Sequence, residues 1–263
     1  MDFIMPLIFI VFGLVVIFYI RPKSQSDIME VKFLKTKKIS ELREIFSQME
    51  QNGLGDDYRE FVELKGKIFS ENLINTPFSN KNVAYCESEL IEVVKTTERY
   101  KDSNGNYQTR TKNQENRISN ERSSQDIKII DESSNTPIYI ELNASGCNLD
   151  IPKTFDRFES KNNLRNYNYF NSFPMNRYGD ETVGFKMIEK TIDSEQNLYI
   201  IGEAYKVGDT IHIGKPMDNK KPFIISTKSE DELVNSSNQN ALSLLVSGII
   251  SIIVGIIFLI RLF

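Results

Sequence analysis

Two uncharged apolar runs at the ends of this 263-residue chain constrain its fold more than any other feature. Residues 3–20 form a run of 18, and residues 241–260 form a run of 20. At about 1.5 Å of rise per helical residue, both runs approach or reach the roughly 30 Å thickness of a hydrocarbon core. The mean hydropathy of −0.33 hides them, because the residues between them are polar. The sequence therefore predicts a two-pass integral membrane protein with a soluble domain between two transmembrane helices.

The charges beside the first run predict that it is an uncleaved anchor. No Lys or Arg precedes it, and Arg21 and Lys23 follow it in place of a small-residue cleavage site. Positive residues gather on the cytoplasmic side of a span. Six of them lie between residues 21 and 38, whereas only Arg261 follows the second run. This bias places the soluble domain in the cytoplasm.

The remaining segments follow from hydrophobic periodicity. After the anchor at residues 1–20, we expect a basic juxtamembrane segment at 21–57 with a short amphipathic helix at 39–50, capped by Ser40. We further expect a β domain at 58–228, a linker at 229–240 and the second transmembrane helix at 241–260.

Small residues recur at every fourth position of the second span. Such a stripe lets two helix backbones approach closely in lipid. It predicts a helix-packing face toward the first span or toward a second copy of the chain, unless the small residues are simply tolerated there. The face comprises Ser243, Ser247, Ser251 and Gly255.

The middle of the chain has the alternating pattern of half-buried β-strands. Val62, Leu64 and Ile68 alternate with Glu63 and Lys65, which predicts that the two charged residues face solvent. Seven or so short runs of this kind, separated by turn signals, predict a mainly β protein with minor α content. Its centre would be a small β-barrel-like domain, with an OB-like barrel as one form, and its polar loop at 100–125 would be a solvated hairpin extension or a flexible loop.

Several motifs of this β region resemble the GIDE domain, and the resemblance covers about residues 58 to 261. The front half carries Leu64-Lys65-Gly66, Thr76-Pro77-Phe78-Ser79, Val83-Ala84-Tyr85, Ile130-Asp131-Glu132-Ser133 and Ile138-Tyr139-Ile140. The closing half carries Glu189, Asn197-Leu198-Tyr199-Ile200-Ile201-Gly202-Glu203-Ala204, Ile213-Gly214-Lys215-Pro216 and Pro222-Phe223-Ile224-Ile225-Ser226-Thr227-Lys228-Ser229-Glu230. The chain departs from the family pattern at Val83, where a Cys is common, and in having no Trp.

The best-known members of the GIDE family are mitochondrial, membrane-anchored E3 ubiquitin ligases whose activity resides in a C-terminal RING. A RING needs eight Cys and His ligands for zinc, and these residues offer only Cys86, Cys147 and His212. The resemblance therefore implies a RING-less, bacterial-type member in the inner membrane, without ligase activity of its own.

No catalytic, cofactor-binding or metal-binding site is expected from the sequence. His212 alternates with two isoleucines and is expected on the outer face of a strand. The two cysteines are expected to be free thiols in the cytoplasm, and no glycine motif for phosphate binding is present.

One stretch, residues 155–178, interleaves aromatic with basic side chains. It has three interpretations: packing over an open barrel end, a partner-binding surface, or a surface for single-stranded nucleic acid, which the net charge of −4 disfavours. The candidate partner surface comprises Phe155, Arg157, Phe158, Arg165, Tyr167, Tyr169, Phe170 and Arg177.

The sequence thus predicts a non-catalytic scaffold or sensor that binds an unknown protein or ligand beside the lipid bilayer. The alternatives are a component of an E3 ubiquitin-ligase-like system, which the resemblance implies, and a membrane-tethered binder of single-stranded nucleic acid.

Overall fold

The computed structural model describes residues 4–20, 34–55, 57–103, 105–123, 127–142, 146–167, 169 and 181–261. The chain is mostly β, with 46% strand and 30% helix, and it contains a closed five-stranded β-barrel and a C-terminal apolar helix. The predicted fold class is therefore confirmed. The chain divides into two compact units, unit 1 (Met1–Lys65, Ala144–Leu149, Leu198–Phe263) and unit 2 (Gly66–Asn143, Asp150–Asn197), which are described separately.

The strands of unit 1 belong to three sequence regions. They are β1 (Thr36–Lys37), the first part of β2 (Arg59–Phe69), β12 (Asn197–Val207), β13 (Thr210–Gly214) and β14 (Ile224–Ser226). β1 runs parallel to β2, with Thr36 opposite Glu63, and β12 pairs antiparallel with both β13 and β14. Ile200 and Ile213 are fully buried, as expected of strands whose apolar side chains point inward.

The amphipathic helix α3 (Ile39–Gln51) lies close to its predicted bounds. Ile39, Leu42 and Phe46 recur at helical spacing and are the buried residues of this helix. The predicted cap was wrong: Lys38 is the N-cap residue, and the Glu41 carboxylate accepts a hydrogen bond of 3.2 Å from its backbone N–H. Glu41, at the third position of the helix, can accept from the Lys38 N–H, which Ser40 inside the first turn cannot reach.

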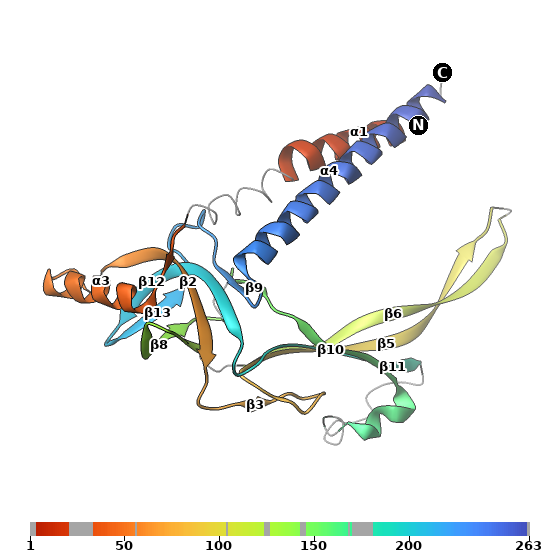
Figure 1. The fold of residues 1–263 in the computed structure, drawn as a ribbon. Helices are drawn as coiled ribbons and strands as arrows, with labels where there is room; N and C mark the ends of the chain where they lie inside the picture. Colours follow the sequence, from red (N-terminus) through yellow and green to blue (C-terminus); the bar gives the residue numbers. More distant parts are fainter. Residues whose placement is uncertain are drawn as a thin grey trace. The chain divides into compact units, whose positions relative to one another are not determined.

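Two apolar helices of unit 1 lie side by side (Figure 1). The first is α1 (Ile4–Val15), continued by the π-helix η1 (Val16–Ile20), and the second is α4 (Glu230–Ile260). Within the described residues, α4 is the one helix long and apolar enough to cross a membrane, and the N-terminal helix is apolar but shorter. The segment at 229–240, predicted as a linker, is helical: Ser229 caps α4, and residues 230–240 form its first turns.

Unit 2 is built around an antiparallel four-stranded sheet. Its strand order is β10 (Lys153–Ser160), β11 (Thr182–Ile192), β5 (Tyr85–Lys101) and β6 (Tyr107–Arg122). β5 and β6 are paired along their length, and their far ends extend beyond β11 (Figure 1). The expected polar loop at 100–125 is therefore largely strand, which is the hairpin-extension alternative.

The other elements of unit 2 are short. They are the end of β2, then β3 (Ile74–Asn75), β4 (Asn82–Val83), β7 (Ile127–Asp131), β8 (Ser134–Ile140), part of β9 (Asn148–Asp150) and the 3₁₀ helix η2 (Lys161–Asn166). A core cluster of Phe78, Leu90, Leu164, Phe185 and Met187 packs against the four-stranded sheet and η2.

Candidate functional site

Glu63 in β2 is a buried charge that the alternation pattern placed in solvent. Glu63 is 1% exposed, and its Oε2 accepts a hydrogen bond of 2.8 Å from the Tyr199 hydroxyl. The Thr36 hydroxyl donates to Oε1. β1 pairs with β2 at this position and brings the Thr36 hydroxyl to the carboxylate. A buried carboxylate needs such donors, because an unpaired one costs several kcal/mol.

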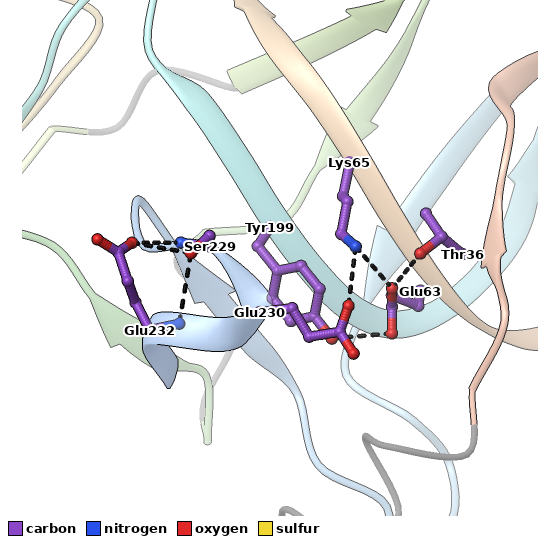
Figure 2. Close-up of polar contacts among 7 residues, drawn as sticks. All are labelled: Thr36, Glu63, Lys65, Tyr199, Ser229, Glu230 and Glu232. Atoms are coloured by element: carbon purple, nitrogen blue, oxygen red, sulfur yellow. Dashed lines mark hydrogen bonds and ion pairs between the residues drawn. The ribbon is translucent and has the colours of Figure 1, made fainter. Parts of the chain in front are cut away.

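Lys65 links this carboxylate to the start of α4, as Figure 2 shows. Its Nζ lies 3.5 Å from Glu63 Oε1 and 2.9 Å from Oε2 of Glu230, the first residue of α4. The ammonium group also lies 5.5 Å from the centre of the Tyr199 ring. We call Thr36, Glu63, Lys65, Tyr199 and Glu230 the junction cluster.

The junction cluster shifts the proton affinity of two of its members. Burial raises the pKa of Tyr199, and its hydrogen bond to Glu63 raises it further. Burial acts to lower the pKa of Lys65, but the carboxylates of Glu230 and Glu63 together outweigh it and raise that pKa. At neutral pH Tyr199 is therefore a neutral donor and Lys65 a cation, which is the arrangement that the contacts require.

The first turn of α4 is fixed by its own cap (Figure 2). The Glu232 carboxylate accepts from the Ser229 backbone N–H at 2.8 Å, and the Glu232 N–H donates to Ser229 Oγ at 3.3 Å. These hydrogen bonds lower the pKa of Glu232. Leu233, one residue further on, packs against Tyr199 and Ile201. Chemically, the junction cluster holds the base of an apolar helix against three strands.

Glu189 of β11 organises a second buried site, which lies within unit 2. It is fully buried and accepts hydrogen bonds from the Phe78 N–H at 2.6 Å, the Ser79 N–H at 3.2 Å and the Ser79 hydroxyl at 2.5 Å. Burial and the Glu189 carboxylate, with a contribution from Glu87, raise the pKa of the Cys86 thiol to about 12. The site therefore secures a loop and keeps Cys86 protonated.

Two of the four residues of the predicted helix-packing face contact α1. Ser251 donates to the Phe9 carbonyl of α1 at 2.9 Å, and a Cβ at Gly255 would lie 2.8 Å from the Pro6 carbonyl oxygen. By contrast, Ser243 and Ser247 are exposed and donate to carbonyls of α4 itself. Within the described residues, the contact with α1 thus involves the C-terminal half of the stripe.

Two glycines that the sequence argument missed complete the contact between α1 and α4. A Cβ on Gly13 would lie 2.6 Å from the Gly248 carbonyl oxygen, and one on Gly248 would lie 2.7 Å from Ile17 Cγ1. Gly248 and Gly255 are seven residues apart, a spacing that repeats on one helix face. That spacing is the sequence signal that could have identified Gly248.

Some residues of the candidate partner surface pack against other aromatic rings, and others are exposed. Phe155 stacks on Phe78 with ring centres 6.5 Å apart, and Tyr169 meets Phe78 edge to face at 5.0 Å. Phe158 is 47% exposed, and the exposed Arg157 lies over the Phe155 ring.

Tyr167, another residue of that surface, is held by a hydrogen bond and by packing. The Tyr167 hydroxyl donates to Glu159 at 2.9 Å, and its ring packs against the core cluster. The side chain of Arg165, and Phe170 and Arg177 entirely, lie outside the described residues. Packing thus accounts for Phe155, Tyr167 and Tyr169, while Arg157 and Phe158 are on the surface.

No metal-binding group emerges from the part of the chain that the structure describes, where no three His, Cys, Asp or Glu side chains are arranged to hold an ion. His212 Nε2 lies 2.9 Å from the Thr210 hydroxyl, and its ring stacks on Tyr205. Both cysteines are free, with Cys86 buried and Cys147 partly exposed.

Together these features define a β-barrel protein whose apolar C-terminal helix is fixed to its strands by a buried polar cluster. The family model for GIDE, described as E3 ubiquitin ligase, matches residues 95–260. This match covers more than half of the chain, and the chain belongs to the GIDE family. Comparison with curated proteins and comparison with solved structures each give no significant match.

Proposed function

We propose that this chain is a membrane-anchored GIDE protein that binds a protein partner close to the bilayer and does not itself transfer ubiquitin. Its role in an E3-ligase-related process would be that of a scaffold or sensor. The observation that carries this proposal is the junction cluster, because Lys65 joins the first residue of the membrane-length helix α4 to the buried Glu63–Tyr199 pair of the strands. A partner bound to the strands would then be held close to the membrane by α4.

The composition of these residues supports the non-catalytic part of the proposal. A RING holds two zinc ions through eight Cys or His ligands, and only Cys86, Cys147 and His212 occur here. A direct test incubates the purified chain with ubiquitin, its activating enzyme and a panel of conjugating enzymes. We expect no ubiquitin chains, and chain formation that depends on this protein would overturn this part.

The binding part is tested by photo-crosslinking in native membranes. A photoreactive phenylalanine analogue at Phe158, which is 47% exposed, should give a discrete light-dependent adduct. The matched control is the same analogue at Ile253, which is 50% exposed on the apolar part of α4 and should give no such protein adduct. If Phe158, Arg157 and other exposed positions on the strands all fail to crosslink, the binding function is wrong.

The same membranes test the proposed orientation. The six basic residues between positions 21 and 38 favour a cytoplasmic domain. A cysteine introduced at Gly105, in the turn after β5, should then react with an impermeant maleimide only after the cells are opened. Reaction in intact cells would reverse the orientation.

A further inference from the structure

The β5–β6 hairpin continues beyond the four-stranded sheet as a two-stranded ribbon (Figure 1). β11 pairs with β5 only as far as Val94, whereas β5 and β6 stay paired to Lys101. We call residues 95–101 and 107–113 the ribbon. It carries five Lys or Arg residues and one carboxylate, Glu98, in a chain whose net charge is −4. The ribbon is thus a basic region of an acidic protein.

The charges are unequally divided between the two faces of the ribbon. Residues directly opposite each other on paired strands share a face. On one face Glu98 forms ion pairs with Arg110 and Lys112. The other, which we call the cationic face, has three cations and no carboxylate; it comprises Lys95, Thr97, Arg99, Lys101, Tyr107, Thr109, Thr111 and Asn113.

The three cations of this face are exposed and have no ion pair within the described part of the chain. Arg99 and Lys101 instead lie over the Tyr107 ring, at 5.2 and 5.0 Å from its centre. The face is therefore suited to an anionic partner recognised by charge and hydrogen bonds.

The strand edges of the ribbon favour a polypeptide over other anions. In the described residues, β6 is an edge strand of the four-stranded sheet, and the pairing of β5 with β11 ends at Val94. The β11-side edge of β5 is therefore also an edge along the ribbon, and β5 is the strand that carries Lys95, Arg99 and Lys101. An edge strand presents backbone N–H and C=O groups to which another extended chain can add.

We propose that the ribbon binds an acidic polypeptide segment, which adds as a strand along the edge of β5 beyond the end of β11, with its carboxylates toward Lys95, Arg99 and Lys101. This inference rests on the proposed binding function and names the chemistry of the partner. The positive charges favour acidic side chains, and the backbone hydrogen bonds between the strands favour an extended peptide.

The test uses the full chain in nanodiscs of phosphatidylcholine and a fluorescein-labelled peptide of alternating Glu and Thr, twelve residues long. Binding is followed by fluorescence anisotropy. Lys95→Gln/Arg99→Gln/Lys101→Gln should weaken binding at least tenfold. The matched control, Lys81→Gln/Lys215→Gln/Lys220→Gln, removes three exposed lysines outside the ribbon and should leave the affinity unchanged.

Two further probes separate the parts of the proposal. A Gln and Thr peptide should bind at least tenfold more weakly, and so should the acidic peptide with alternate amides N-methylated, because it cannot form the ladder. Equal binding of the methylated peptide would overturn strand addition. Tighter binding of a deoxythymidine 12-mer, lost in the ribbon variant, would make the surface a nucleic-acid site and overturn the proposal.

The proposed function is tested independently, since crosslinking at Phe158 does not involve the ribbon. If the ribbon variant and the parent bind the acidic peptide equally while the Phe158 adduct persists, this inference is wrong and the binding function stands. If no position on the strands gives an adduct, the binding function fails whatever the peptide does.

Discussion

Replacing Tyr199 by Phe tests the junction cluster with the smallest possible change. The substitution keeps the ring and removes the hydroxyl that donates to Glu63 at 2.8 Å. A hydrogen bond to a charged group contributes about 1.5–3 kcal/mol, and Glu63 keeps Thr36 and Lys65 as partners. We therefore expect the free energy of unfolding to fall by about 2 kcal/mol at pH 8.

The pKa of Tyr199 gives this prediction a second, more specific signature. Folding raises that pKa above the unfolded value of about 10. The contribution of the hydroxyl is therefore complete below pH 10 and is lost as the pH rises further, because the unfolded state ionises first. The loss is about 1.4 kcal/mol per pH unit, so the difference between parent and variant should fall to about 0.6 kcal/mol at pH 11.

The measurement is urea unfolding of the full chain in detergent micelles, followed by far-ultraviolet circular dichroism at pH 8 and pH 11. Tyr107→Phe is the control, since Tyr107 is 64% exposed and its hydroxyl should contribute less than about 0.5 kcal/mol. The reasoning is refuted if Tyr199→Phe changes stability no more than this control at pH 8. It is also refuted if the Tyr199 effect is the same at both pH values.

Three further predictions concern the other buried contacts. Glu189→Gln should cost about 2 kcal/mol and speed amide exchange at Phe78 and Ser79 at least tenfold, because one oxygen acceptor is lost; unchanged exchange would contradict the role of the carboxylate. Cys86, with a pKa of about 12, should resist iodoacetamide at pH 8 until the chain unfolds, and rapid labelling of the folded chain would contradict its burial. Gly255→Leu should abolish a disulfide between cysteines placed at Phe9 and Phe258, whose rings stack at 6.2 Å, whereas the exposed control Ile256→Leu should preserve it.

Local pattern was sufficient to predict much of the fold. Ile39, Leu42 and Phe46 are the buried residues of α3, and Ile211 and Ile213 are buried on either side of His212. In each case the periodicity of the side chains matches the one face that is covered. The family motifs from Ile130 onward likewise lie in the region that the GIDE model matches, whereas the motifs between Leu64 and Tyr85 precede that region.

The pattern failed where a strand or helix contacts a segment distant in sequence. Glu63 alternates with apolar neighbours as a surface residue would, but β1 and Tyr199 cover it. The polar residues before the second apolar run resemble a linker, yet Ser229 and Glu232 cap a helix that includes them. The Ser229 and Glu232 capping pattern could be recognised in the sequence, whereas the distant residues that contact Glu63 could not.

A carboxylate at position 63 has a purpose that an apolar side chain could not serve. Replacing a whole buried ion pair by apolar residues is often neutral or stabilising, because it avoids the cost of burying charge. Leu at position 63 alone would leave the Tyr199 and Thr36 hydroxyls without this acceptor, and Lys65 with Glu230 as its remaining carboxylate partner. Those donors come from β12, β1 and β2, and Lys65 also holds the first residue of α4. The shared acceptor therefore links three strands, and through Lys65 the base of the apolar helix, which an apolar side chain at position 63 could not do.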